Sequence, residues 1–149
     1  MNIRPARAED YTLIRALLVA SELPVEDLSE SAPIQFLIGE DSGARLMGCV
    51  GLEVHDRAGL LRSLAVQPSL RSQGVGAALV DAVQQSAATA GIERLWLLTT
   101  TATAFFLRSG YEVADRVAAP ELIRLSLQFA SICPASAICM TRTLQPLSR

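Results

Sequence analysis

The sequence predicts a mixed α/β (α+β) fold in which a single, mainly antiparallel sheet of about seven strands is flanked by about four helices. Three neighbouring strand-like segments are joined by short turns, which implies an antiparallel meander. After Gly76 the apolar residues change to helical spacing. Residues 94–100 then form a continuous apolar run, which is typical of a strand covered on both faces.

The predicted elements follow one another as a strand, a helix, three strands, and three helices that each precede a further strand. Proline or glycine marks several of their ends: Pro5 and Pro68 close strands, and Gly91 and Gly110 follow helices. The connection from the fourth strand to the fifth predicts a right-handed crossover. The expected strands are residues 2–4, 36–39, 45–54, 60–66, 94–100, 111–113 and 138–143, and the expected helices are residues 8–20, 77–90, 102–109 and 120–131.

The composition is that of an ordinary globular protein. Of the 149 residues, half are hydrophobic and 19% are charged, which predicts one domain, residues 1–149, with a sizeable core. Thirteen arginines, no lysine and fifteen acids give a net charge of −2. Because the arginines are scattered, the sequence favours neither a nucleic acid nor a membrane as a partner.

Targeting and cysteine patterns add two expectations. The N-terminus has no signal-peptide pattern and no apolar stretch reaches the roughly 20 residues of a membrane span, so we expect a cytoplasmic protein. Cys49, Cys133 and Cys139 are an odd set without metal-ligand spacing. The sequence therefore predicts reduced thiols and no metal site.

The loop at residues 71–76, with the sequence RSQGVG, carries the most chemical information. It leads from the strand at residues 60–66 into an amphipathic helix, so its glycines can turn consecutive N–H groups toward one anion at the helix N-terminus. This pattern predicts a phosphate-binding loop, although glycines at such a turn also occur without a ligand. A P-loop is excluded because it needs lysine, and a dinucleotide fingerprint needs a glycine where Leu79 stands.

The motif Arg71-x-x-Gly74-x-Gly76, preceded by the strand 64–66 and Pro68, resembles the acetyl-coenzyme A signature of the GNAT N-acetyltransferases. The resemblance covers nearly the whole chain and includes three further strings: IRPARAEDY, LWLLTT and AFFLRSGY. Five other strings are similar to the ArsN-type subgroup, which is named for arsenic-resistance operons: LPVEDL, GCVGLE, LLRSLAV, LLTTTA and CPASAICM.

The resemblance implies that backbone amides of the glycine loop bind the pyrophosphate of coenzyme A (CoA), and that its pantetheine arm pairs with the fourth strand. It also implies that the fourth and fifth strands splay apart to admit the thioester. The residues expected to contact acetyl-CoA are Leu64, Ala65, Val66, Arg71, Ser72, Gln73, Gly74, Val75, Gly76, Ala77, Thr99 and Phe106.

The implied reaction moves acetyl from acetyl-CoA to a primary amine by direct attack in a ternary complex, with the Leu64 N–H polarising the carbonyl. The residues that many relatives use as acid and base are replaced here by Phe106 and Leu60. Glu53 and His55 lie on one face of the third strand and are the substitute candidates for the base. A solvated histidine in a turn is the alternative for His55.

Arg62, Ser63 and Thr100 are the expected acceptor-binding residues. Arg62 can bind the carboxylate of an amino acid or of an amino-acid-like, arsenic-related compound, or it can form a structural salt bridge. A non-catalytic acetyl-CoA sensor is the alternative function. Dimers through the last strand, residues 138–143, are expected by analogy. The cysteines are either small buried apolar groups or, if two sulfurs converge, an arsenic(III) site.

Overall fold

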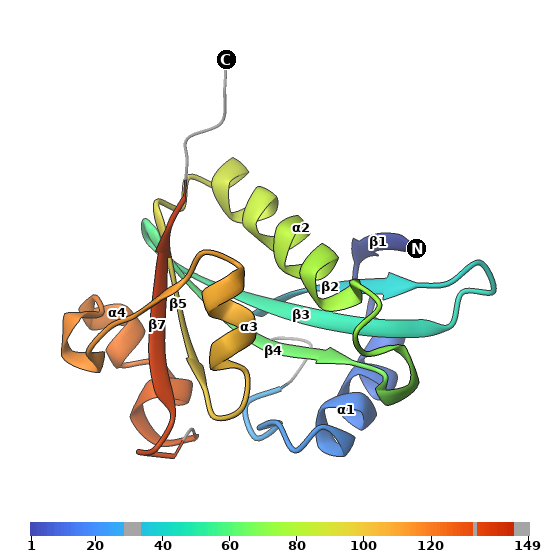
Figure 1. Ribbon diagram of the computed structural model, residues 1–149, viewed down its shortest axis with the longest axis horizontal. Coiled ribbons are helices and arrows are strands. Elements are labelled where there is room, and N and C mark those ends of the chain that lie inside the picture. The colour runs from blue at the N-terminus through green and yellow to red at the C-terminus, as the bar shows by residue number, and fades with distance from the viewer. Residues whose placement is uncertain (29–33, 133, 145–149) are drawn as a thin grey trace.

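A seven-stranded sheet organises the part of the chain that the computed structural model describes, residues 1–28, 34–132 and 134–144 (Figure 1). Its strand order is β1-β2-β3-β4-β5-β7-β6, and every neighbouring pair is antiparallel except β4 and β5. The predicted mixed, mainly antiparallel sheet is confirmed. The strands are β1 (Asn2–Pro5), β2 (Ile34–Glu40), β3 (Leu46–His55), β4 (Ala58–Val66), β5 (Arg94–Thr99), β6 (Glu112–Val113) and β7 (Ile138–Thr143).

Helices cover both faces of this sheet. Helix α2 packs on one face of β2, β3 and β4, whereas α1 lies on the other face of the same strands (Figure 1). Helix α4 packs against the beginning of β4 and against β5 and β7. The helices are α1 (Tyr11–Ala20), α2 (Val75–Thr89), α3 (Thr103–Arg108) and α4 (Glu121–Arg124), with shorter helical turns at η1 (Ala8–Asp10), η2 (Pro68–Leu70), η3 (Arg116–Ala118) and η4 (Gln128–Ile132).

The continuous helix expected at residues 120–131 is wrong, because the segment is divided in two. Helix α4 ends at Arg124, and a π-helical turn begins at Gln128. Between them the Ser126 hydroxyl donates to the Ile123 carbonyl at 2.6 Å and accepts from the Phe129 N–H at 3.4 Å. A serine hydroxyl that competes for backbone groups in this way interrupts the regular helical ladder.

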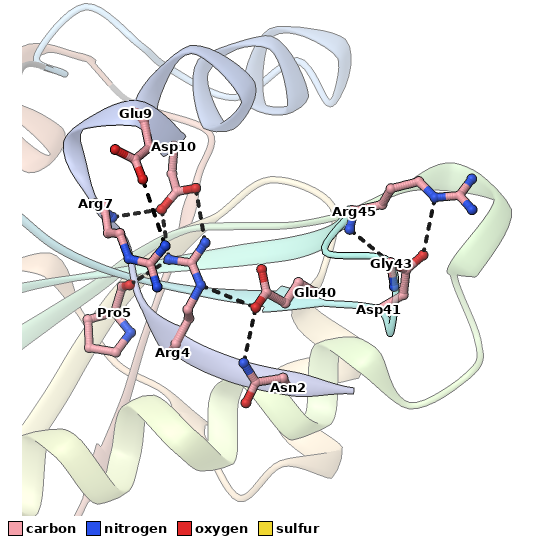
Figure 2. Close-up of polar contacts among 10 residues, drawn as sticks. All are labelled: Asn2, Arg4, Pro5, Arg7, Glu9, Asp10, Glu40, Asp41, Gly43 and Arg45. Carbon is pink, nitrogen blue, oxygen red and sulfur yellow. Dashed lines mark hydrogen bonds and ion pairs between the residues drawn. The ribbon is translucent and has the colours of Figure 1, made fainter.

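Arg4 fastens the edge strand β1 to the elements around it (Figure 2). Its guanidinium donates to both oxygens of Asp10 at 2.8 and 3.1 Å and to Glu40 Oε1 at 3.3 Å. Asp10 also accepts the Arg7 N–H at 2.7 Å. The Arg4 hydrogen bonds, helped by that N–H, hold the pKa of Asp10 below its usual value despite the opposing effect of partial burial.

An irregularity in β4 shapes the centre of the sheet. Cys49 of β3 pairs with Ala65, but Gly51 pairs with Arg62, so residues 63–64 of β4 stand opposite a single residue of β3. Two residues opposite one define a β-bulge. The bulge lies where β4 separates from β5, its neighbour on the other side.

The bulge also changes which side chains of β4 share a face. Ser63 has a φ of +56°, in the left-handed region. As a result Leu61 and Leu64, three residues apart, both pack with the α2 core, whereas Ala65 packs with the α1 core. Arg62 points to the α1 side, where it meets Asp27 from the segment after α1.

Strands β4 and β5 diverge beyond the start of their pairing. Their parallel register runs only from Ala58 opposite Arg94 to Leu60 opposite Trp96. Strand β5 continues beside β7 as far as Thr99, while β4 runs away from it (Figure 1). The predicted splaying of the fourth and fifth strands is confirmed. Within the described part of the chain, no strand lies beside the β4 backbone edge after Leu60 on that side.

Candidate active site

Two adjoining cavities lie where β4 and β5 diverge. The first, of about 410 Å³, is lined by residues 61–64 of β4 and 97–99 of β5 together with the segment after α1, and is called the Arg62 cavity here. The second, of about 610 Å³, is lined by residues 64–66 and by the start of α2, and is called the glycine-loop cavity. The linings of the two cavities share Leu23, Leu64, Thr101 and Ala102. They therefore form one groove that passes the bulge.

The glycine-loop cavity ends at the N-terminus of α2. Gly74 precedes the helix with a φ of +84°, and no side chain caps the helix. The first helical hydrogen bond runs from the Ala78 N–H to the Gly74 carbonyl at 3.1 Å, so the N–H groups of residues 75–77 have no partner within the helix. Such a terminus, with its positive dipole end, favours an anion.

Gly76 leaves space in this cavity. A Cβ at this position would lie 3.5 Å from the Phe105 ring, an ordinary contact. Packing of the protein alone therefore does not require glycine here. Because both residues line the cavity, a side chain at position 76 would take its room from a ligand.

The side chains around the glycine-loop cavity also favour an anion. Arg71 and Arg108 line it, and the described lining contains no Asp or Glu. Ser21 lines it too, although its hydroxyl oxygen is buried and has no hydrogen-bond partner among the described residues. The residues present therefore fit the diphosphate of CoA.

Arg108 was not predicted from the sequence. It follows Phe105 by three residues in α3, so the two side chains share a helical face. Because Phe105 was not an expected site residue either, no local signal pointed to Arg108. Leu70, Ser21 and Leu23 also line the cavity without having been predicted.

Arg62 is the centre of a buried cluster of charges. Its side chain is 1% exposed and makes a two-pronged ion pair with both oxygens of Asp27. Its Nη1 also donates to Glu53 Oε2 at 2.8 Å, and its Nε donates to the Ser63 hydroxyl at 3.1 Å. Burial alone would lower the pKa of Arg62, but the hydrogen bonds to Asp27 and Glu53 raise it above the ordinary value, so the guanidinium stays charged.

Glu53 connects this cluster to His55. Its Oε1 lies 2.9 Å from His55 Nε2, while its other oxygen accepts from Arg62. Neither Glu53 nor His55 belongs to the described lining of the two cavities. Arg62, in contrast, both contacts Glu53 and lines the Arg62 cavity.

The structure brings most of the predicted site residues to the groove. The expected acceptor-binding residues Arg62, Ser63 and Thr100 all line the Arg62 cavity, as do Thr99 and Phe106. The expected CoA contacts that line the glycine-loop cavity are Leu64, Ala65, Val66, Arg71, Ser72, Gly74, Gly76 and Ala77.

Two expected CoA contacts lie elsewhere. The side chain of Val75 is buried in the core beneath α2. Gln73 lies outside the described lining, and its amide donates to the Ser69 carbonyl at 3.4 Å. Their backbone N–H groups still belong to the loop.

Aromatic and hydroxyl groups near β5 have structural partners. Thr99 Oγ1 accepts the Ala102 N–H at 3.0 Å and so stabilises the turn into α3. Phe106 packs edge-to-face against Phe105 and Tyr111. The Tyr111 hydroxyl donates to Gln84 Oε1 at 2.9 Å, and burial raises the pKa of this phenol. Leu60 is buried in the α4 core.

The two described cysteines are buried, free thiols that belong to different apolar clusters. Burial raises the pKa of Cys49 to about 12, and burial also raises that of Cys139. Cys133 lies outside the described residues. Within those residues, no group of three or more His, Cys, Asp or Glu side chains is placed to hold a metal ion. None of the helices described is long and apolar enough for a membrane crossing.

Comparison with known proteins finds a family model, sequence relatives and solved structures that resemble this chain. The family model for the GNAT acetyltransferase domain matches residues 32–113. An amino-acid acetyltransferase of Mycobacterium tuberculosis is 30% identical over 118 residues, which cover 73% of this chain and 67% of the relative.

Solved structures agree with this match. N-acetylglutamate synthase from Neisseria gonorrhoeae, complexed with CoA and L-arginine, has a TM-score of 0.76 at 26% identity, over 96% of this chain and 33% of that one. Its complex with CoA and N-acetyl-glutamate has a TM-score of 0.78 at 25% identity, over 97% of this chain and 35% of that one. The chain thus spans about a third of the length of that enzyme. Tetrahymena GCN5 shares the fold, with a TM-score of 0.78 at 14% identity over 99% of both chains.

Proposed function

This chain belongs to the GNAT acetyltransferase family, whose members act with CoA, and we propose that it acetylates the primary amine of a small molecule. The observation that carries this proposal is the groove at the divergence of β4 and β5, which joins a cavity suited to an anionic diphosphate to a second cavity across Leu64. Residues 1–149 act as one catalytic domain in this proposal.

The glycine loop and two arginines hold the cofactor end of the groove. The N–H groups at the start of α2 donate to the diphosphate, and Arg71 and Arg108 supply positive charge beside it. The open backbone edge of β4 at residues 64–66 pairs with the amide groups of the pantetheine arm, as an added strand would. When bound, acetyl-CoA supplies the acetyl group, which a neutral amine accepts by direct attack, so that CoA is released as the thiol.

The bulge leaves the backbone of Leu64 outside regular strand pairing. Residues 63–64 stand opposite one residue of β3, and β5 has already diverged, so the Leu64 backbone lies outside regular strand pairing on either side. We infer that the Leu64 N–H donates to the thioester carbonyl oxygen, where negative charge develops in the transition state. A main-chain donor fixed in this way works without any particular side chain.

The acceptor ammonium must lose a proton before it can attack. Glu53 and His55 are the proposed acceptors of this proton, and their 2.9 Å contact supports a shared role. Neither residue belongs to the described lining of the cavities, so they take the proton through water. Arg62 does line the cavity, but a guanidinium does not take up a proton. The leaving thiolate is protonated by solvent in this proposal, since Phe106 and Leu60 carry no acid or base.

Amino acids are the first acceptors to test, because two of the similar proteins are an amino-acid acetyltransferase and an N-acetylglutamate synthase. The strings that resemble the ArsN-type subgroup support adding an amine that carries an arsenic group to the same panel. Arg62, Ser63 and Thr100 are the proposed acceptor contacts. A homodimer through β7 is proposed by analogy with the family alone.

The test is release of CoA thiol from acetyl-CoA in the presence of a panel of primary amines. Saturable turnover with at least one amine supports the proposal. Saturable binding of acetyl-CoA by calorimetry, with no thiol release above the rate without protein, contradicts it and supports a sensor instead. A Gly76→Val variant provides the control, because turnover that depends on this groove falls with the affinity for CoA.

A further inference from the structure

Most of the N–H donors of Arg62 are already hydrogen-bonded to other residues of the protein. A guanidinium has five N–H donors, and four of those of Arg62 are directed to Asp27, Glu53 and Ser63. A carboxylate bound in the usual forked manner needs two parallel N–H donors. The one remaining N–H can meet a neutral oxygen of a ligand, but it cannot form that fork.

The charge of Arg62 is also balanced within its own cluster. Asp27 and Glu53 give two negative charges against one positive charge, so the cluster carries −1 with His55 neutral and zero with His55 protonated. Neither state offers net positive charge to a ligand.

The rim of the Arg62 cavity is acidic. Glu22 and Glu26 are exposed and line it, and Arg62 is the one cationic side chain in the lining that the structure describes. Two like charges on a rim repel a carboxylate and attract an ammonium group. The glycine-loop cavity has the opposite character, with Arg71 and Arg108 and no acid in its described lining. Each cavity therefore favours a ligand of a different charge.

We propose that the acceptor is a cationic amine without a carboxylate, such as a diamine or a decarboxylated or amidated amino acid. This inference rests on the proposed function and selects among its acceptors. Asp27 occupies the forked position on Arg62 that the carboxylate of an amino acid would need, so free amino acids are poor acceptors.

A matched trio of compounds tests the inference: arginine, arginine amide and agmatine. The amide keeps the α-amine of arginine and removes the carboxylate charge, and agmatine removes the whole group. Because amidation also lowers the pKa of the α-amine, kcat/KM is compared per molecule of neutral amine. We expect kcat/KM for thiol release to be about tenfold higher for the amide and for agmatine than for arginine at low ionic strength, with a smaller ratio in 0.5 M salt. An alkyl amine has a higher pKa than an α-amine, so proton loss alone would favour arginine over agmatine.

Two variants connect the preference to named residues. Glu26→Gln removes a rim charge and should lower several-fold the ratio of kcat/KM for arginine amide to kcat/KM for arginine. The control is Glu112→Gln, an exposed change on β6 outside both cavities, which should leave this ratio unchanged. Asp27→Asn removes one of the two charges that balance Arg62 and should improve turnover of arginine relative to the amide. Because the Asp27 side chain is only 9% exposed and ion-paired, the Asp27→Asn variant could fail to fold, and the Glu26 variant then still tests the inference.

The outcomes separate the two proposals. Arginine used as well as or better than its amide, with normal binding of CoA, overturns the inference and leaves the proposed function standing. A ratio that Glu26→Gln and Asp27→Asn both leave unchanged overturns it as well. Absence of thiol release with every amine overturns the proposed function itself.

Discussion

The guanidinium of Arg62 on β4 forms an ion pair with both carboxylate oxygens of Asp27, 35 residues earlier in the chain. The pair fastens the segment after α1 to the strand that carries the bulge. It is nearly excluded from water, with the two side chains 1% and 9% exposed. It therefore links the stability of the fold to the geometry of the groove.

Replacing Arg62 by alanine should lower the free energy of unfolding by about 3–5 kcal/mol, because Asp27 and Glu53 would remain buried without a counter-charge. Urea denaturation measures the change. Arg57→Ala is the matched control: its ion pair with Glu93 has side chains 76% and 66% exposed, so its removal should cost under about 1 kcal/mol. Equal losses in the two variants would contradict a stabilising role for the buried cluster.

Gly76→Val should weaken binding of CoA by at least about tenfold, since the side chain takes room from the glycine-loop cavity, with only a small drop in melting temperature. Calorimetry gives the affinity and thermal unfolding gives the stability. Ser86→Val, at an exposed position further along α2, controls for the helix propensity of valine. Unchanged affinity in the Gly76 variant would remove the basis for placing the diphosphate at this loop.

Arg108→Ala should raise the Kd for CoA several-fold and make that Kd less sensitive to salt, because one cation beside the diphosphate is lost. Titrations at two salt concentrations measure both effects. Arg45→Ala supplies the control, as its side chain is 86% exposed and lies outside the described lining of both cavities. The same salt dependence in wild type and Arg108→Ala would show that Arg108 does not act on the bound anion.

Asp10 should make the protein sensitive to acid. Its pKa is held down in the folded state by Arg4, so its contribution to stability is complete above its unfolded value of about 3.8 and is lost as the pH falls through the lower folded value (Figure 2). The difference in melting temperature between wild type and Asp10→Asn should therefore be constant near neutrality and shrink below about pH 4. Glu9→Gln, at an exposed neighbour, should differ little from wild type in melting temperature at any pH. If the difference between wild type and Asp10→Asn instead widened in acid, the assignment would be refuted.

Cys49 should resist alkylation in the folded protein. Its pKa of about 12 leaves almost no thiolate at pH 8, and the side chain is buried. Iodoacetamide labelling followed by peptide mass spectrometry should find the Cys49 peptide unmodified under native conditions and modified in urea. Rapid native labelling would mean that the segment opens readily.

The sequence was most informative where local rules decide the structure. The alternation and turns of the meander, the strand at residues 138–143 and the presence of a helix after Gly74 all follow from neighbouring residues, although α2 begins at Val75, two residues earlier than expected. The splaying of β4 and β5 came from the family resemblance alone, because nothing local encodes the absence of pairing.

Contacts between distant segments were the part that could not be predicted. Arg62 was left open between a ligand for the acceptor and a structural salt bridge, and Asp27 was not considered, because 35 residues separate the two. Alternation did place Glu53 beside His55, since both lie on one strand. Ser126 interrupts the expected last helix through a hydroxyl contact that the apolar spacing does not record.

The bulge has one consequence for the design of shortened variants. A chain that lacked only Ser63 would set Leu64 opposite Val50 and align the third and fourth strands without interruption, with the apolar side chains still on their present faces. The molecule would gain a smoother sheet and lose the main-chain donor on which acetyl transfer is proposed to depend. Acetyl transfer would then depend on the one extra residue that forms the bulge, and engineering that selects only for stability tends to remove such residues.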